Sequence, residues 1–156
     1  MHDLVVRPES MDGPVAQRLL AELDVELHER YGGGGDPVRA DAADFAPPEG
    51  LFLVAWVDGQ AEGCAGFRRL DDATAELKRM YVRPERRGTG LARALLAAVE
   101  GCAVASGYRR MWLETGLPQP EAMALYRASG YEPIASFGQY ADSPSQRCFG
   151  KALPVT

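Results

Sequence analysis

Apolar and polar residues follow two different periodicities along this chain. Alternating or β-branched apolar runs, which are typical of strands, occupy residues 4–7, 51–57, 60–69, 75–82, 110–114 and 147–153. Apolar residues spaced three or four positions apart, as on one face of a helix, occupy residues 10–31, 91–105 and 119–129. The pattern therefore predicts a strand and a helix first, then consecutive strands, then alternating helices and strands.

Local signals place the ends of several of these elements. Ser10 is expected to cap the first helix, and Asp58-Gly59 to form a hairpin turn. Gly107 ends the second helix, and Gly130 follows the third as its C-terminal cap. This order of elements predicts an α+β fold in which antiparallel hairpins precede a βαβ unit.

Length and composition are those of an ordinary globular protein. With 156 residues, 46% hydrophobic and 25% charged, we expect a single domain over residues 1–156. The first residues do not resemble a signal peptide, and no segment approaches the ~20 apolar residues of a membrane span. We therefore expect a cytoplasmic protein with no membrane partner. The three cysteines lie far apart and only two histidines are present, so we expect buried thiols and no metal.

The most informative stretch is 80–92, where a strand passes through a turn rich in glycine and arginine into a helix. The first amides of a helix have no partner within it, and the helix dipole favours an anion there. The stretch lacks the G-x-x-x-x-G-K-[ST] pattern, and Arg93 occupies the last position of a G-x-G-x-x-G fingerprint. Arg87, Gly90 and Ala92 instead fit the pattern R-x-x-G-x-A.

The charge of this stretch differs from that of the whole chain, which carries 17 Lys and Arg against 22 Asp and Glu. A local basic cluster in an acidic chain suits a polyanionic cofactor. Elsewhere no basic patch is interleaved with aromatic residues, so no nucleic-acid partner is expected. The cluster, which only Glu85 opposes along the sequence, consists of Lys78, Arg79, Arg83, Arg86, Arg87 and Arg93.

The R-x-x-G-x-A loop resembles the pyrophosphate loop of the GNAT superfamily of acyl-CoA-dependent N-acyltransferases. Residues 122–131, AMALYRASGY, resemble a second signature of that superfamily, A-x-x-L-Y-x-x-x-G-[FY]. Residues 63–67, GCAGF, resemble its G-x-x-x-[FL] strand, and the order of elements matches over essentially the whole chain. The resemblance implies a GNAT-like mixed, mostly antiparallel central sheet flanked by helices, with a βαβ cofactor-binding unit.

The same resemblance implies acetyl-CoA as a cosubstrate, with its pyrophosphate on the loop, and no metal. Many members carry Asn three residues before the Ala of the second signature, whereas this chain has Gln119, with the same amide on a longer stem. The implied cofactor-binding residues are Met80, Tyr81, Val82, Arg86, Arg87, Gly88, Thr89, Gly90, Leu91, Ala92 and Gln119.

Acyl transfer from a thioester to an amine needs a base for the ammonium, a donor for the oxyanion and a proton for the thiolate. By resemblance, Glu76 on the central strand is the general base, acting through desolvation or a water relay, and Glu114 is its rival. Tyr126 of the second signature is implied as the general acid, since a phenol can donate while remaining protonated at neutral pH.

The geometry of the strand at 75–82 bears on both the base and the oxyanion donor. If the strand were regular, Glu76, Lys78 and Met80 would lie on one side of it. By resemblance, it bulges near residues 80–82 and exposes backbone amides that would bind the oxyanion.

The sequence leaves the acceptor open. The resemblance implies a small-molecule primary amine that is acetylated by direct transfer. A protein or peptide N-acetyltransferase and a non-catalytic CoA-binding module are the alternatives, and a homodimer is also left open. Candidate acceptor-site residues, each of which also fits an ordinary surface or core position, are Glu26, Glu29, Tyr31, Asp36, Phe45 and Tyr140.

Overall fold

The computed structural model describes residues 3–32, 42–116, 119–137 and 146–154. Its strands are β1 (Leu4–Pro8), β2 (Leu51–Val57), β3 (Gln60–Arg69), β4 (Thr74–Val82), β5 (Arg110–Gly116), β6 (Glu132–Pro133) and β7 (Gln146–Ala152). Its helices are α1 (Pro14–Tyr31), α2 (Leu91–Ala105) and α3 (Pro120–Ala128), and its short 3-10 turns are η1 (Ala42–Phe45) and η2 (Pro84–Arg86). None of these helices is long and apolar enough to cross a membrane.

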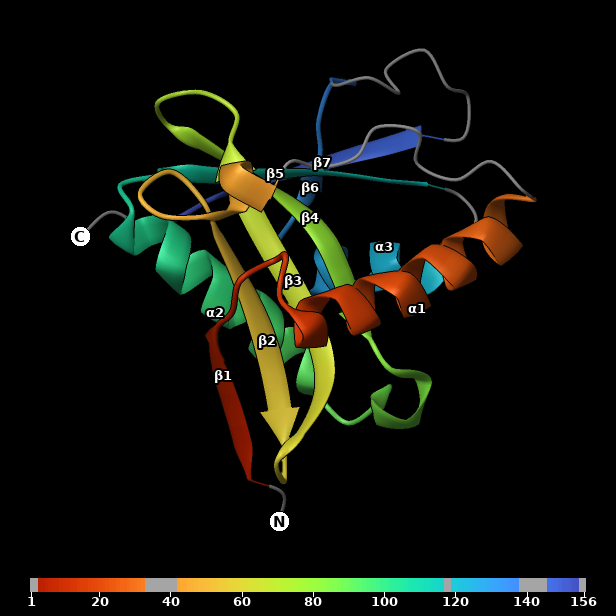
Figure 1. Cartoon of the computed structure of the whole chain (residues 1–156). Helices are drawn as coiled ribbons and strands as arrows, with labels where there is room; N and C mark the ends of the chain where they lie inside the picture. The colour runs from red at the N-terminus through yellow and green to blue at the C-terminus, as the bar shows by residue number, and fades with distance from the viewer. Residues whose placement is uncertain (1–2, 33–41, 117–118, 138–145, 155–156) are drawn as a thin grey trace.

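The strands form one seven-stranded sheet in the order β1-β2-β3-β4-β5-β7-β6 (Figure 1). β4 and β5 are parallel and are joined through α2, whereas the other neighbouring strands are antiparallel. A parallel pair needs a long crossover, and α2 supplies it. The expected α+β fold, a mostly antiparallel sheet with one βαβ unit, is confirmed.

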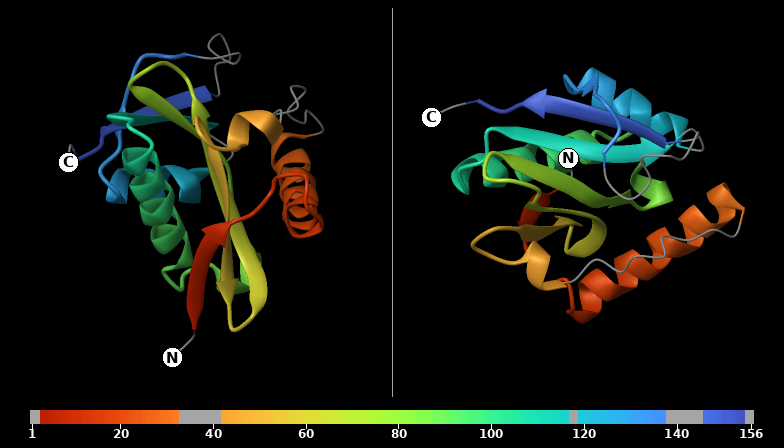
Figure 2. Two further views of the ribbon diagram at one scale, coloured as in Figure 1. Left: turned by 60° about the vertical axis from the view of Figure 1, so that its left-hand side comes forward. Right: turned by 90° about the horizontal axis from the view of Figure 1, so that it is seen from above.

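Helices cover both faces of the sheet, with α1 on one face and α2 and α3 on the other (Figure 2). Two apolar clusters hold the layers together. The larger cluster, on the side of α2 and α3, includes Leu77, Leu95, Val99, Leu113, Tyr126 and Phe149. The smaller cluster, on the side of α1, includes Leu19, Leu23, Phe45, Phe52, Val54 and Tyr81.

The first helix begins later than its sequence signal suggested. Pro14 is its first residue and Gly13 precedes it as the cap residue, without a side-chain hydrogen bond to the helix. The carbonyl of Ser10 accepts a hydrogen bond from Gly13 N at 3.0 Å, which forms a turn ahead of the helix. The expected capping role of Ser10 is therefore wrong, because proline, which has no N–H to leave unpaired, sets the start instead.

β4 bulges against β3 at Arg79 and Met80, where the pairing register shifts. Arg79 has a φ of 60°, which is uncommon for a residue with a Cβ. Met80 packs against the larger cluster, and Tyr81 belongs to the smaller one. Met80 therefore does not lie on the side of Glu76 and Lys78, as it would in a regular strand, because the bulge shifts the alternation by one residue.

β4 and β5 separate half-way along β4. Their pairing runs from Thr74 with Arg110 to Leu77 with Leu113, although β4 continues to Val82 and β5 to Gly116. We call residues 74–77 of β4 its paired half and residues 78–82 its parted half. The two strands thus open like a V on the side that faces the turn before α2.

Candidate active site

The glycine turn before α2 is open to a ligand. Gly88 and Gly90 have φ values of 77° and 88°, and a Cβ built on either would meet no heavy atom within 4 Å. Gly90 is the cap residue of α2, without a side-chain cap, and its carbonyl accepts the hydrogen bond from Ala94 N at 3.1 Å. The amides of the first helical turn therefore have no partner within the helix, and an anion such as a pyrophosphate fits them. Thr89 sits between the glycines, and its hydroxyl donates to the carbonyl of Arg86.

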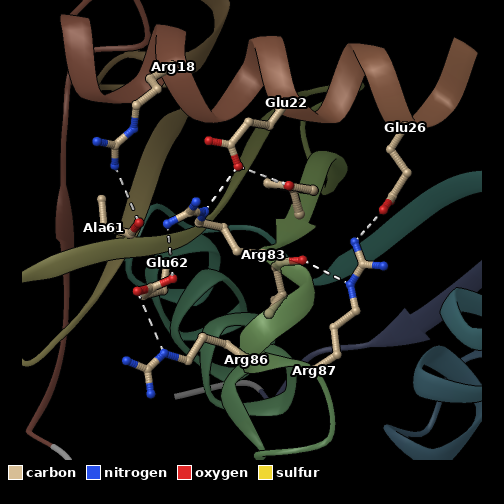
Figure 3. Close-up of polar contacts among 10 residues, drawn as sticks. Arg18, Glu22, Glu26, Ala61, Glu62, Arg83, Arg86 and Arg87 are labelled. Carbon is tan, nitrogen blue, oxygen red and sulfur yellow. Dashed lines mark hydrogen bonds and ion pairs between the residues drawn. The ribbon is translucent and has the colours of Figure 1, made fainter.

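Arg86 and Arg87, which were expected to flank this turn, are both paired with carboxylates from other parts of the chain (Figure 3). Arg87 donates from Nε to the carbonyl of Val82 at 3.0 Å and from a terminal nitrogen to Glu26 Oε1 at 2.5 Å. Arg86 Nε lies 3.6 Å from Glu62 Oε1. Carboxylates from other parts of the chain therefore oppose the basic cluster in the fold, in addition to Glu85, which is its one acidic neighbour along the sequence.

α1 is tied to the parted half of β4 by a further carboxylate, Glu22. Its Oε1 accepts hydrogen bonds from Tyr81 Oη at 3.0 Å and from Arg83 Nε at 3.1 Å (Figure 3). Burial and this contact with Glu22 raise the pKa of Tyr81 to about 12, so its phenol stays protonated. The side chain of Tyr81 thus faces α1. No local sequence signal pointed to Glu22 or Glu62, because the sequence near them does not indicate which turn of a helix crosses which strand.

The end of α1 also reaches the start of α3. Arg30 Nε lies 3.9 Å from Glu26 Oε2, and a terminal nitrogen of Arg30 pairs with Glu121 in the first turn of α3. The hydrogen bond from Arg30 lowers the pKa of the Glu121 carboxyl. The two helices are therefore joined by charged side chains near the end of β5.

The remaining expected cofactor residues lie around the parted strands. Met80 and Ala92 pack against the larger cluster, and Val82 and Leu91 belong to it. Gln119 precedes α3 as its cap residue, and its backbone N–H donates to the carbonyl of Gly116, the last residue of β5, at 2.9 Å. The structure therefore brings the parted half and the start of α2 together in one cluster, and it places Gln119 at the end of β5.

Glu76 lies in the paired half and is 2% exposed. Its Oε1 accepts a hydrogen bond from Arg68 Nε at 3.1 Å, and its Oε2 is 3.9 Å from Lys78 Nζ. Arg68 had not been singled out, although the register of the hairpin, which pairs Arg68 with Glu76, would have indicated it. Glu76 also lines a cavity of about 460 Å³, together with Ala43, Asp44, Ala46, Pro47, Pro48, Glu49, Arg68, Arg69 and Leu70.

Glu114, the rival base, is the first residue of β5 beyond its pairing with β4. Trp112 pairs with Glu76, so alternation puts Glu114 on the same face of the sheet as Glu76. Burial raises the pKa of the neighbouring Cys148 thiol, and the charges of Glu114 and Glu76 add to that effect. Both carboxylates therefore remain candidates on geometric grounds.

Tyr126 projects from α3 into the larger cluster and is 6% exposed. Its ring meets Tyr131 edge-on, with the centroids 5.7 Å apart. Burial raises the pKa of the Tyr126 phenol, which therefore stays a proton donor over the whole neutral range. On β5, Thr115 Oγ1 is buried and has no hydrogen-bond partner among the described residues. An orphaned hydroxyl in the strand segment that has left β4 is consistent with a ligand in this place.

The other candidates contribute less to the site. Glu26 is paired with Arg87 and Arg30, and Phe45 is buried in the smaller cluster and does not line the cavity. Asp36 and Tyr140 lie outside the described residues. Within the described part of the chain, no group of three or more His, Cys, Asp or Glu residues could hold a metal ion.

Comparisons with known proteins agree with this geometry. The model of the acetyltransferase (GNAT) family matches residues 2–131. An IAA acetyltransferase of Azospirillum brasilense is 33% identical over 154 residues, covering 98% of this chain and 100% of that protein. The structure of a putative acyl-CoA N-acyltransferase from Klebsiella pneumoniae is 27% identical, with a TM-score of 0.84 over 97% of this chain and 98% of that one.

A more distant structure shows the fold alone. A GNAT family acetyltransferase from Elizabethkingia anophelis, with acetyl-CoA bound, is 18% identical and has a TM-score of 0.70 over 96% of this chain and 98% of that one.

The family match spans most of the chain, and the relatives are acyltransferases of the same length and architecture. This protein therefore belongs to the acetyltransferase (GNAT) family of acyl-CoA-dependent N-acyltransferases.

Proposed function

We propose that the protein transfers an acetyl group from acetyl-CoA directly to the primary amine of a small molecule. The observation that carries the proposal is the separation of β4 from β5. The separated strands lie between an open glycine turn and a buried carboxylate that lines a cavity. The name of the Azospirillum relative and the acetyl-CoA in the Elizabethkingia structure support the choice of acyl donor.

In this proposal the pyrophosphate lies on the amides from Gly88 to Ala92, and the thioester enters between the parted strands. Glu76, directly or through a water, takes a proton from the ammonium, because a free alkylamine with a pKa of ~10.4 is mostly protonated at neutral pH. The amine attacks the thioester carbonyl, and backbone amides at the bulge stabilise the oxyanion. The attacking nitrogen loses its second proton to water, the C–S bond breaks, and Tyr126 donates its proton to the departing thiolate and is reprotonated from water.

The charged groups around Glu76 affect how it works as a base. Arg68 occupies Oε1, which leaves Oε2, on the side of Lys78, for a proton or a water. Glu114 lies on the same face of the sheet. It would act as the base in place of Glu76 if the amine approached from the side of β5.

A thiol-release assay with acetyl-CoA and a panel of primary amines tests the proposal, with each product identified by mass. We expect turnover that depends on the added amine and exceeds the hydrolysis measured without it. Peptides with free N-termini form a second arm of the panel. If acetyl-CoA binds but no amine is acetylated, the protein is a CoA-binding module, and if only peptides react, the small-molecule assignment is wrong.

A further inference from the structure

The cavity beside Glu76 is formed by parts of the chain that do not belong to the cofactor turn. Its walls come from η1 and the loop that follows it, from the end of β3 and from the start of β4. Its volume of about 460 Å³ is within the range of small-molecule sites. The charged residues that line it are Asp44, Glu49, Arg68, Arg69 and Glu76.

Arg68 is suited to bind an anion in this cavity. Its Nε donates to Glu76, and no other hydrogen bond from its guanidinium to a described residue is present. The two terminal nitrogens of a guanidinium form a planar fork that matches a carboxylate. The contact through Nε fixes the orientation of the group and leaves this fork for a ligand.

Arg69 supplies a second guanidinium. It pairs with Asp72 at 2.5 Å, but the side chain of Asp72 is 97% exposed. An ion pair in such contact with water contributes little to stability. A carboxylate held in the cavity can therefore compete with Asp72 for Arg69.

Two cationic side chains flank Glu76, although the cavity lining as a whole carries three carboxylates and two guanidiniums. Arg68 and Lys78 both lie beside this one carboxylate, and their side chains are 27% and 15% exposed. Neighbouring cations favour the neutral form of an entering amine, which is the form that attacks a thioester. The same cations would repel a second ammonium group, so a polyamine fits this place poorly.

We infer that the cavity binds the carboxylate of the acceptor, and that the acceptor is a small amine carrying one carboxylate, as an amino acid does. The carboxylate is held by the fork of Arg68, with Arg69 beside it, and the amine points past Glu76 toward the parted half of β4. Asp44 and Glu49, which are exposed, offset the arginines and disfavour a second carboxylate. This inference rests on the proposed function, because it names the acceptor class of that transfer.

The first experiment compares matched acceptors on the wild-type enzyme. A series of α-amino acids is tested beside the corresponding carboxamides and decarboxylated amines, at one acetyl-CoA concentration. We expect kcat/KM for the acid to exceed that for its amide at least tenfold. Amides or simple amines that react equally well or better would overturn the inference while leaving the proposed function intact.

The second experiment uses Arg68→Gln and Arg69→Gln, with Arg7→Gln on β1 as a control of equal charge change far from the cavity. The measured quantity is the ratio of kcat/KM for acid and amide, in which any effect on the chemical step cancels. Both cavity variants should lower this ratio at least fivefold, and Arg7→Gln should leave it unchanged. An unchanged ratio in both cavity variants would overturn the inference.

Calorimetry provides a readout that does not depend on turnover. The amino acids are titrated into the protein saturated with CoA, and Arg68→Gln should weaken their binding at least fivefold. If no amine is acetylated but this binding is present and depends on Arg68, the carboxylate site stands and the proposed function fails. If no amino acid binds in either experiment, the carboxylate site is wrong.

Discussion

The paired half of β4 has a neighbouring strand on each side, whereas the parted half has only β3. In the paired half, Thr74 and Ala75 are 0% exposed and Glu76 is 2% exposed. In the parted half the backbone bulges, and the chain is held through side chains, by Tyr81 and by the adjacent Arg83, both on Glu22 of α1.

This difference shows how one strand can serve two purposes. The paired half holds the Glu76 carboxylate in a buried position, which its proposed role as a positioned base requires. The parted half gives up one set of strand pairings and so leaves room for a ligand to enter between β4 and β5. The following changes are ordered from the largest expected effect to the smallest.

Tyr126→Phe tests whether the leaving group is protonated from the side of α3. The ring and its packing on Tyr131 remain, and one hydroxyl is lost. A general acid contributes ~10²–10⁴ in rate, or about 3–5 kcal/mol of barrier, so kcat should fall in that range with acetyl-CoA affinity little changed. The loss should shrink with an acyl donor whose thiol is more acidic.

The matched control is Tyr131→Phe, because this neighbouring phenol is also buried and donates to Glu100 Oε2 at 2.8 Å. It should lower the stability but not kcat. Full kcat in Tyr126→Phe would make the Tyr126 hydroxyl structural.

Glu76→Gln tests the chemistry of the paired half. We expect kcat/KM to fall about a hundredfold at neutral pH, the lower end of the effect of a general base, because Glu114 or a water can partly replace it. The loss should shrink as the pH approaches the pKa of the amine, where the acceptor is already deprotonated. Parallel pH profiles measured with Glu114→Gln separate the two carboxylates, and a uniform loss at every pH would argue against proton transfer.

Gly90→Asp and Gly90→Asn, compared with each other, test the cofactor turn. Both place a similar side chain on a backbone with a φ of 88°, so they share the conformational cost. Only Asp adds a negative charge at the start of α2. We expect acetyl-CoA affinity, measured by calorimetry, to be at least tenfold weaker for Asp than for Asn, or about 1.4 kcal/mol. Equal affinities of the two variants for acetyl-CoA would contradict the placement of the pyrophosphate on this turn.

The hydroxyls of two threonines sharpen the comparison at the smallest scale. Thr115 Oγ1 has no partner among the described residues, whereas Thr74 Oγ1 in the paired half accepts a hydrogen bond from Arg110 Nε. Thr115→Val should therefore raise the free energy of unfolding by about 1 kcal/mol in the absence of acetyl-CoA, and Thr74→Val should lower it. Thermal unfolding with and without acetyl-CoA measures both. A loss of stability in Thr115→Val would show that its hydroxyl is satisfied in the folded protein.

Periodicity and turn residues predicted most of the fold. The hairpin at Asp58-Gly59, the glycine turn and the stop at Gly107 depend on local backbone preferences, and all are present with positive φ values. The bulge was placed near residues 80–82 by resemblance, and it lies at Arg79 and Met80. The start of α1 was misplaced, because two signals competed there and Pro14 prevailed over Ser10.

The site was predictable only where it is local in the sequence. The turn from Gly88 to Ala92 could be recognised because its amides and glycines are consecutive. The partners of its arginines, Glu26 and Glu62, lie far away in the chain, and only the packing of α1 on the sheet brings Glu26 close. Arg68 occupies an intermediate position, because the hairpin register determines its contact with Glu76.

The bulge at Arg79 also acts as a frame shift within the strand. Every side chain after the bulge lies on the face of the sheet opposite to the one that it would occupy in a regular strand. Deletion of Arg79 would restore the regular frame and turn Tyr81 toward α2, away from Glu22, and Val82 toward α1. A single residue therefore sets which side of the sheet receives each group that follows it, and the two faces of the enzyme stay distinct only while that extra residue is kept.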